Sequence, residues 1–285
     1  MTAGTLKGKW AIILGASSGF GAAAARELAR HGVNIIGVHL DRRAALAGVE
    51  ALVKELQGSG AQALYFNVNA ADPAKRQEVL DQAQAKLGGS TISVLMHSLA
   101  FGTLKPYLTE DPKGQLTKDQ MEMTLDVMAN SLVYWVQDLL GRKLLGKGSR
   151  VFAMTSSGGA RVWPNYGAVS AAKAALESHV RQLAMELAPF GVTANCIRAG
   201  VTDTPALRKI PGNEQMMEFA KLRNPYHRLT TPEWRALAVI GESGRLPHLA
   251  RLGSFAGVRG LLHRAGGVTS TGVGVRRYVP HAAQQ

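Results

Sequence analysis

Short apolar runs alternate with longer amphipathic segments over about the first 200 residues, and this alternation restricts the fold more than any other feature. The apolar runs have the length of buried β-strands and occupy residues 10–14, 33–38, 61–66, 92–96, 150–154 and 192–197. The segments between them carry apolar residues at helical spacing and occupy residues 21–31, 43–57, 72–87, 121–145 and 166–188. Because neighbouring parallel strands need a long return path, this order predicts βαβ units with right-handed crossovers. The sequence therefore predicts an α/β chain with one doubly wound parallel sheet.

Length and composition are those of one globular α/β domain. The chain has 285 residues, of which 46% are hydrophobic and 19% are charged, and these values exclude an intrinsically disordered chain. No continuous apolar segment reaches the ~18 residues that a membrane helix needs. The chain starts without the apolar core of a signal peptide, and its lone Cys196 cannot form an intrachain disulfide. We expect a cytoplasmic protein with no membrane partner.

The chain is basic, with 33 Lys and Arg against 20 Asp and Glu and a formal net charge of +13. A charge of this size raises the question of nucleic acid, an anionic membrane or a phosphorylated ligand as partner. Aromatic residues make up only 6% of the chain, and no nucleic-acid reading motif interleaves them with basic residues. We expect a phosphorylated small ligand, no nucleic acid and no bound metal.

A glycine-rich turn follows the first predicted strand and leads into the first predicted helix. Glycines at its first, fifth and seventh positions let a backbone approach phosphates closely, and a helix N-terminus attracts the pyrophosphate of a dinucleotide. The alternative is a purely structural β-α turn, since three glycines alone are a weak signal. The residues predicted to contact the cofactor here are Gly15, Ser17, Ser18, Gly19, Phe20 and Gly21.

The end of the second predicted strand is the place where the adenosine ribose of such a cofactor binds. His39 lies there, and Arg42 and Arg43 follow. Two guanidinium groups would hold a 2′-phosphate through charge-assisted hydrogen bonds, whereas Asp41 would repel one if it pointed inward. We therefore predict NADPH, with NADH as the alternative. The competing interpretation of both arginines is a solvated helix start.

Several motifs together resemble those of the short-chain dehydrogenase/reductase family. They are the glycine turn, Ser156 after the fifth strand, Lys173 with its Ala-Ala-Leu-Glu tail, and the segment 199–204. The resemblance runs from about residue 8 to residue 233. It implies a single Rossmann-type domain, a nicotinamide cofactor, and a catalytic Ser/Tyr/Lys set with a helper asparagine, whose place Asn130 takes here.

The tyrosine departs from the common pattern of that family. Most members have it four residues before the lysine, where this chain has Val169, and Tyr166 lies seven residues before Lys173. This spacing, together with the segment 97–101 (His-Ser-Leu-Ala-Phe), resembles the enoyl-acyl-carrier-protein reductase branch. The commonest form of that branch has a second tyrosine where Ser156 stands here, so the likeness is to a divergent form.

The resemblance assigns roles to these side chains. Tyr166 is expected to stabilise the oxyanion and to donate a proton, and Ser156 is a second donor. Lys173 is expected to hold the nicotinamide ribose and to lower the pKa of the phenol. Asn130 is either the helper or a helix-packing residue. The remaining positions expected to contact the cofactor are Asn67, Val68, Ser98, Leu99, Ala100, Gly200, Val201 and Thr204.

The expected reaction is NAD(P)H-dependent reduction of trans-2-enoyl thioesters, carried on acyl carrier protein or on CoA, in fatty acid biosynthesis. In such a thioester the hydride lands three atoms from the oxygen that takes up the charge, so a more distant tyrosine suits it. Residues 205–222, with Met216, Met217 and Phe219, are expected to cover the acyl chain. The resemblance also implies a homotetramer.

Two other functions remain open at this stage. Ser156 and Asn130 fit a short-chain ketoreductase or hydroxysteroid dehydrogenase, and only the tyrosine offset argues against that activity. The second alternative is a non-catalytic Rossmann protein that senses nucleotides or binds nucleic acid, which the high charge suggests.

The resemblance stops near residue 233, and residues 234–285 form an Arg- and Gly-rich segment. From residue 243 onward there is no Asp, Glu or Lys, but there are six arginines, which carry almost half of the net charge. Such a change in composition indicates either a frame-shifted tail or a divergent one. We predict that the family's seventh strand is missing or irregular in this segment, and that residues 1–233 form the catalytic domain.

Overall fold

The computed structural model describes residues 6–233 of the chain. Six parallel strands form one sheet in the order β3-β2-β1-β4-β5-β6. The strands are β1 (Trp10–Leu14), β2 (Asn34–His39), β3 (Ala63–Asn67), β4 (Ile92–His97), β5 (Arg150–Ser156) and β6 (Thr193–Ala199). This arrangement confirms the predicted doubly wound parallel sheet.

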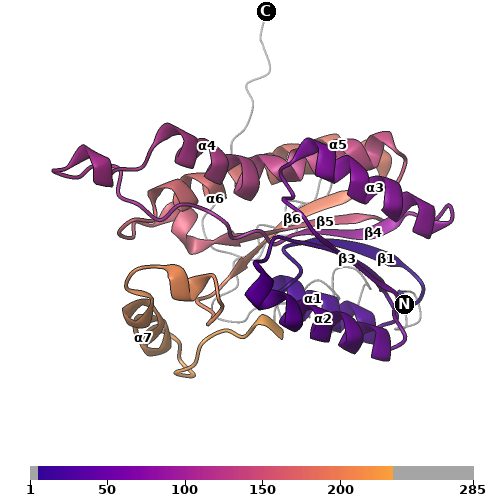
Figure 1. Cartoon of the computed structure of the whole chain (residues 1–285), viewed down its shortest axis with the longest axis horizontal. Helices are drawn as coiled ribbons and strands as arrows, with labels where there is room; N and C mark the ends of the chain where they lie inside the picture. Colours follow the sequence, from indigo (N-terminus) through magenta and orange to yellow (C-terminus); the bar gives the residue numbers. More distant parts are fainter. Residues whose placement is uncertain (1–5, 234–285) are drawn as a thin grey trace, which may run out of the picture.

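Helices cover both faces of the sheet (Figure 1). One face carries α1 (Gly19–Arg30) and α2 (Arg43–Gly58). The other carries α3 (Pro73–Leu87), α4 (Lys118–Leu125), α5 (Ser131–Gly141) and α6 (Gly167–Glu186). A further helix, α7 (Asn213–Arg223), lies apart from these two layers, below α6 in Figure 1.

The sheet is buried on both sides, which explains why its strands are continuously apolar in sequence. In β1, Trp10, Ile12 and Leu14 pack into the core on one face, and Ala11 and Ile13 pack into the core on the other. All five are at most 4% exposed. A strand buried on both faces has no polar side to alternate with, so a parallel sheet of this kind reads as an apolar run rather than as an alternating one.

The predicted single helix over residues 121–145 is wrong. The structure has two helices here, α4 and α5, joined by a π-helical turn at Asp126–Asn130. The extra residue of a π-turn leaves the apolar spacing almost unchanged, so the sequence pattern does not reveal it. Leu144 and Leu145 are buried in the core although they lie beyond the end of α5, and they make the pattern look longer than the helix.

Helix α4 also begins earlier than the sequence pattern predicts. Thr117 forms a capping box with Gln120, in which the side chain of each accepts a hydrogen bond from the backbone N–H of the other. This cap satisfies backbone donors that would otherwise be free at the helix start. Helix α4 therefore begins at Lys118, three residues before the predicted Met121.

The turn between β1 and α1 allows no side chain at its glycines. Gly15 and Gly19 adopt φ angles of +87° and +53°, in the left-handed region that glycine tolerates best. A Cβ at Gly21 would overlap the carbonyl oxygen of Gly15, and one at Gly15 would overlap the carbonyl oxygen of Ser98 on the neighbouring chain segment. The glycines bring three backbone segments into direct contact.

The sheet order opens a crevice at one edge. β1 pairs with β2 on one side and with β4 on the other, so the connections from their carboxyl ends leave in opposite directions. In doubly wound sheets, ligands bind at this switch point. The glycine turn and the end of β4 both lie at it.

The predictions for the C-terminal segment concern residues that the structure does not describe. The missing seventh strand, sought between residues 266 and 279, lies outside the described part of the chain, as does all of the segment 234–285. Among residues 6–233, no helix is long and apolar enough to cross a membrane.

Substitution of Gly21 by alanine tests the contact between the turn and α1. We expect Gly21→Ala to lower the free energy of unfolding by about 1–3 kcal/mol, because the new Cβ overlaps a backbone oxygen. Gly48 lies inside α2 with no atom within 4 Å of its Cβ position. Gly48→Ala should therefore raise the free energy by about 1 kcal/mol. Urea unfolding of both variants measures the two changes, and equal effects would contradict the crowding at Gly21.

Candidate active site

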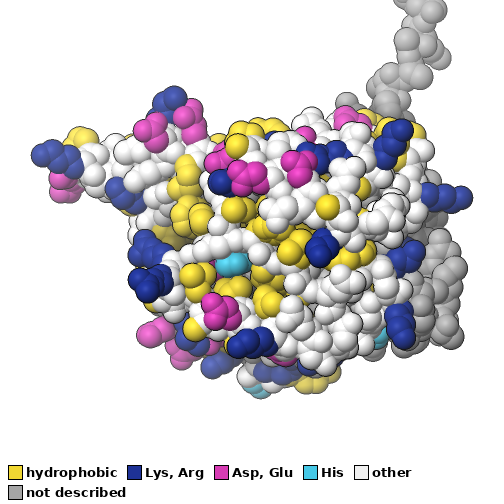
Figure 2. All heavy atoms as spheres, turned by 45° about the vertical axis from the view of Figure 1, so that its right-hand side comes forward, with side chains coloured by type: hydrophobic (Ala, Val, Ile, Leu, Met, Phe, Trp, Pro, Cys, Tyr) yellow, Lys and Arg dark blue, Asp and Glu magenta, His cyan; other side chains and the backbone are white. Residues whose placement is uncertain are grey.

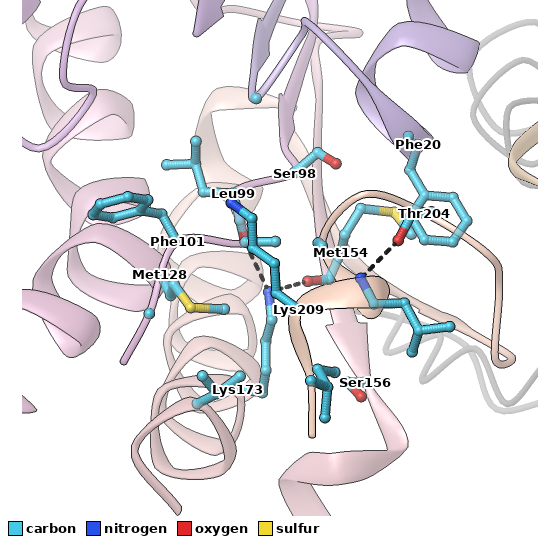
Figure 3. A pocket seen from close by; sticks show the side chains of 18 of the residues that line it. Phe20, Ser98, Leu99, Phe101, Met128, Met154, Ser156, Lys173, Thr204 and Lys209 are labelled. Carbon is cyan, nitrogen blue, oxygen red and sulfur yellow. Dashed lines mark hydrogen bonds between the residues drawn. The ribbon is translucent and has the colours of Figure 1, made fainter. Parts of the chain in front are cut away.

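A cleft of about 780 Å³ opens at the carboxyl edge of the sheet. It brings the predicted catalytic residues Ser156, Tyr166 and Lys173 together with most of the predicted cofactor positions. The predicted cofactor residues that line it are Gly15, Ser17, Ser18, Gly19, Phe20, His39, Val68, Ser98, Leu99, Ala100, Lys173, Gly200, Val201 and Thr204. Figure 3 shows Lys173 within the pocket, between Phe101 and Met128 on one side and Phe20 and Thr204 on the other.

The glycine turn fits the pyrophosphate of a dinucleotide. Gly21 does not line the cleft, but its missing side chain lets α1 approach Gly15. Helix α1 has no acidic residue in its first turn and no side-chain cap on its first amides. These amides and the positive end of the helix dipole suit a phosphate group. The residues present therefore fit a nicotinamide dinucleotide.

The adenosine end of the cleft differs from the sequence-based expectation. Arg42 and Arg43 are exposed and do not belong to the cleft lining, whereas Asp41 does. The Nδ1 atom of buried His39 lies 2.9 Å from the Asp41 carboxylate. Asn67 does not line the cleft either, because its side chain bonds the backbone N–H and C=O of Asp41 at 2.9 and 3.0 Å. The NADPH prediction has the Arg42 and Arg43 side chains pointing into the cofactor site. It differs from the structure because a sequence motif does not specify where a side chain points.

Tyr166, the first residue of the predicted helix, is the N-cap residue of α6 in the structure. The helix itself begins at the next residue, Gly167. The preceding Asn165 has a φ of +61°, and this left-handed residue turns the chain into the helix. The phenol ring packs against Gly158, where a Cβ would lie 2.5 Å from the ring. Burial raises the pKa of the Tyr166 phenol above its ordinary value, and a hydrogen bond with Ser156 acts in the opposite direction. Lys173 was expected to lower this pKa, and in the structure Ser156 is the group that does so.

Ser156 is the last residue of β5, and its surroundings are tightly bonded. Its Oγ accepts a hydrogen bond from the backbone N–H of Gly158 at 3.0 Å. The hydroxyl of Ser170, on the first turn of α6, donates to the carbonyl of Gly158 at 2.6 Å. These bonds fix the loop that carries the serine next to the helix that follows the tyrosine.

Lys173 lies on α6 with only 6% of its surface exposed. Its Nζ donates hydrogen bonds to the carbonyl oxygens of Met154 at 2.8 Å and of Leu99 at 3.2 Å, as the dashed lines in Figure 3 show. Burial lowers its pKa from 10.5 to about 8. The lysine thus joins α6 to the ends of β4 and β5 at the floor of the cleft.

Asn130 does not take part in the cleft. Its side-chain oxygen lies 3.1 Å from the Nε2 atom of His179 on α6, and Asn130 does not line the pocket. In the structure Asn130 lies between helices and outside the cleft lining, and its role as a helper stays a prediction. His179 was not considered in the sequence, and no spacing rule links it to Asn130.

The far end of the cleft is apolar and partly covered by α7. Phe101, Leu104 and Met128 line it from one side, and Met216 and Phe219 line it from α7. Met217, also expected there, is not in the lining. The indole N–H of Trp163 donates to the carbonyl of Pro211 at 2.9 Å and ties the segment before α7 to the loop before Tyr166.

Three basic residues of this end were missed by the sequence reasoning. Arg161, Lys209 and Arg223 line the cleft, and no carboxylate of the described residues joins the lining except Asp41 at the adenosine end. The side chain of Lys209 points into the pocket in Figure 3. The sequence does not show whether a basic side chain points into a cleft or into solvent. Only the occurrence of basic residues in or beside segments expected to lie near the substrate could have suggested these three as lining residues. Residues 6–233 contain no cluster of three metal-ligating side chains.

Comparison with known proteins identifies the family. The family model described as "Enoyl-(Acyl carrier protein) reductase" matches residues 15–240. The chain belongs to the short-chain dehydrogenase/reductase family. It is therefore an oxidoreductase of that family, with an enoyl-reductase-like domain.

The relatives of this dehydrogenase/reductase are named as reductases or dehydrogenases of different substrates. Glycine betaine reductase ATRR of Emericella nidulans is 32% identical over 76% of this chain, which spans only 16% of that protein's length. Cyclohexanol dehydrogenase of a Rhodococcus strain is 26% identical, with 80% of this chain and 86% of that protein covered. 1-Cyclohexenylcarbonyl-CoA reductase of Streptomyces collinus is 26% identical, with 69% and 65% covered.

Solved structures share the fold. A short-chain dehydrogenase from Burkholderia cenocepacia in complex with NADP superposes with a TM-score of 0.70, at 24% identity, covering 84% of this chain and 91% of that one. Enoyl-[acyl-carrier-protein] reductase (NADH) from Aquifex aeolicus gives 0.71 at 22% identity, with 84% and 90% covered. At these identities the two structures show the fold alone.

The buried lysine of this dehydrogenase/reductase should leave a mark on stability. The pKa of Lys173 is about 8 in the folded protein and has its ordinary value of 10.5 in the unfolded chain. Between these values the unfolded state binds more protons, so the contribution of Lys173 to stability rises with pH. The free energy of unfolding of the wild type minus that of Lys173→Met should increase from pH 8 to pH 10.5, as measured by urea unfolding. Lys54→Met, which removes an exposed lysine, is the control. A difference for Lys173→Met that does not change over this range would contradict the burial of a titrating ammonium.

Proposed function

We propose that this protein reduces the C=C bond of trans-2-enoyl thioesters, with NADPH as the cofactor. The observation that carries this function is the position of Tyr166. The phenol lies at the N-cap of α6, seven residues before Lys173, and faces a cleft whose far end is apolar. A ketoreductase places its phenol beside the carbon that receives hydride, whereas an enoyl reductase needs its donor at an oxygen three atoms away.

The chemistry needs a hydride, a proton and a group that stabilises negative charge. When bound, the nicotinamide cofactor supplies the hydride, which the Cβ atom of the enoyl thioester receives. Tyr166 would donate a hydrogen bond to the thioester oxygen, where the negative charge collects. The raised pKa of its phenol keeps the proton on the tyrosine at neutral pH, so that it acts as a donor.

The other side chains hold the phenol and the cofactor in place. Ser156, hydrogen-bonded to Tyr166, orients the phenol and offers a second donor to the substrate oxygen. Lys173 would hold the nicotinamide ribose through its ammonium group. Thr204 and Val201 line the cleft and would contact the nicotinamide end. These roles remain proposals for this chain.

The far end of the cleft suits an acyl chain on a phosphate-bearing carrier. Its apolar lining would take the acyl group, and Arg161, Lys209 and Arg223 would attract the phosphate of a phosphopantetheine arm. On the face that Figure 2 shows, hydrophobic side chains gather near the middle, and both basic and acidic side chains lie around them. Two likenesses support a conjugated thioester as the substrate. They are the match to the family model described as "Enoyl-(Acyl carrier protein) reductase" and the relative named 1-cyclohexenylcarbonyl-CoA reductase. We propose acyl carrier protein or CoA as the carrier, and fatty acid biosynthesis as the setting.

Location, assembly and domain limits also remain proposals. We propose a cytoplasmic homotetramer whose catalytic domain spans residues 1–233. Light scattering of the purified protein at several concentrations would measure the mass of the assembly directly.

One observation favours a ketoreductase or hydroxysteroid dehydrogenase as the second candidate. Ser156 and Tyr166 both line the cleft, and their two hydroxyls could donate to one carbonyl oxygen of a ketone. That arrangement would serve a ketone as well as a thioester.

Turnover of two substrates separates these candidates. We expect the protein to oxidise NADPH with crotonyl-CoA at a kcat/KM at least ten times that with acetoacetyl-CoA. Tyr166→Phe should lower kcat with crotonyl-CoA by about 100-fold, because it removes an oxyanion donor. Oxidation with acetoacetyl-CoA alone would establish the ketoreductase. No turnover with either, in a protein that binds NADPH, would favour a nucleotide sensor.

The packing of Tyr166 gives a second test with a matched control. A Cβ at Gly158 would lie 2.5 Å from the Tyr166 ring, whereas one at Gly159 would make only ordinary contacts of 3.4 Å or more. Gly158→Ala should displace the phenol and lower kcat with crotonyl-CoA at least tenfold. Gly159→Ala should leave kcat within twofold of the wild type. Equal effects of the two substitutions would contradict the assigned place of the tyrosine.

Cofactor choice is testable at the adenosine end. Asp41 in the lining would repel a 2′-phosphate, and the exposed pair Arg42 and Arg43 beside it would attract one. We expect the wild type to have a KM for NADPH at least tenfold below that for NADH. The double variant Arg42→Gln/Arg43→Gln should raise the KM for NADPH about tenfold and leave that for NADH unchanged. A wild type that prefers NADH, together with an Asp41→Asn variant that gains NADPH, would show that Asp41 decides the choice.

A further inference from the structure

A carboxylate lies one helical turn beyond Lys173 on α6, outside the cleft lining. Glu177 follows Lys173 by four residues on α6, so the two side chains share a face of the helix. Glu177 does not line the cleft, although Lys173 and Thr155 both do. Its side chain is only 13% exposed.

Two residues of the sheet hold this carboxylate. The Thr155 hydroxyl, on β5, donates to Glu177 Oε1 at 2.7 Å. Nη2 of Arg198, on β6, donates to the same oxygen at 2.7 Å. Thr155 and Arg198 are direct partners in the pairing of β5 with β6. Glu177 therefore binds α6 to both strands at a single level of the sheet.

The same level of the sheet carries the anchor of the lysine. Met154, whose carbonyl oxygen accepts from Lys173 Nζ at 2.8 Å, is the residue before Thr155. Two successive residues of β5 thus bond two residues of α6 that lie one turn apart, through the pairs Met154–Lys173 and Thr155–Glu177. A shift of one pair along the strand would move the other.

The groups around Lys173 leave Glu177 as its counter-charge. His97 on β4 is fully buried, and burial, followed by the charge of Lys173, lowers its pKa to about 3, so it is neutral. Cys196 on β6 has a pKa that burial raises to about 12, so it is a neutral thiol. Burial lowers the pKa of Lys173, and the two groups that act against this are Cys196 and Glu177. Since the thiol is uncharged at neutral pH, Glu177 provides this effect there.

Two further groups complete the surroundings of the lysine. Tyr166 precedes α6, and burial raises the pKa of its phenol, so it is neutral at the pH of the reaction. Arg198 carries a positive charge that the Glu177 carboxylate partly offsets. The carboxylate is thus shared between two cations, one of which is the lysine of the cleft.

We propose that Glu177 is a positioning residue for Lys173. Its carboxylate, held by Thr155 and Arg198, keeps the buried ammonium charged and in register with β5. This inference rests on the proposed function only through the use of Lys173 in that reaction. Glu177 itself touches neither cofactor nor substrate.

Direct titration of the lysine tests this role without any substrate. NMR of protein with isotope-labelled lysine side chains would follow the Nζ group, and Lys173→Met would identify its signal. We expect a midpoint of about 8 in the wild type and a midpoint lower by about one pH unit in Glu177→Gln. Glu186→Gln removes an exposed carboxylate from the last turn of the same helix and should leave the midpoint unchanged. An unchanged midpoint in folded Glu177→Gln would overturn the inference.

A second variant separates charge from packing and covers a failure of Glu177→Gln to fold. Arg198→Gln removes the competing cation and leaves Glu177 to act on the lysine alone. The midpoint of Lys173 should then rise or stay the same. A fall would show that disrupted packing, rather than the carboxylate, sets the state of the lysine, and would overturn the inference.

Turnover then distinguishes this inference from the proposed function. With crotonyl-CoA and NADPH, the pH at which kcat falls on the alkaline side should move down in Glu177→Gln by the same amount as the midpoint. A shifted midpoint in a protein whose wild type does not reduce crotonyl-CoA would refute the proposed function and support the role of Glu177. A shifted midpoint with an unshifted kcat profile would overturn the link between Glu177 and the reaction.

Discussion

The parallel pairing of β1 with both β2 and β4 is the constraint on which the rest of the structure depends. It splits the chain into two halves whose connections diverge, and the crevice between them is the cleft. Beside the cleft, Gly15 and Gly21 let backbone segments touch where a Cβ would overlap a carbonyl oxygen. Polar and titratable side chains line the cleft at the carboxyl edge of the sheet. They come from the ends of β4, β5 and β6 and from the start of α6.

Lys173 places a titrating ammonium in the interior, with only 6% of the residue exposed. Burial of an ammonium is unfavourable unless hydrogen bonds and an opposite charge compensate for the lost water. Two carbonyl oxygens and a carboxylate one turn away provide this compensation. The same contacts fix α6 against the sheet, and α6 in turn sets the place of Tyr166 at its N-cap. The contacts that stabilise the buried ammonium are therefore the same contacts that hold the helix against the sheet.

The sequence predicts the fold and the cleft well where backbone geometry decides the outcome. The strand Trp10–Leu14 is apolar throughout because both faces are buried, and the spacing of Ser156, Tyr166 and Lys173 places all three in one cleft. The sequence-based prediction fails where the outcome depends on the direction of a side chain or on an extra residue in a helix. Arg42 and Arg43 lie outside the cleft lining, and the π-turn at Asp126–Asn130 leaves the apolar spacing intact.

The central claim is that hydride reaches a carbon three atoms from the oxygen that Tyr166 stabilises. A single molecule with both reducible groups tests it most directly. The protein would be incubated with trans-2-hexenal and NADPH that carries deuterium at the transferable position, and NMR would locate the deuterium in the product. We predict hexanal with deuterium at the third carbon. Hexenol with deuterium at the first carbon would contradict the claim, because hydride would then have reached the carbon that bears the oxygen.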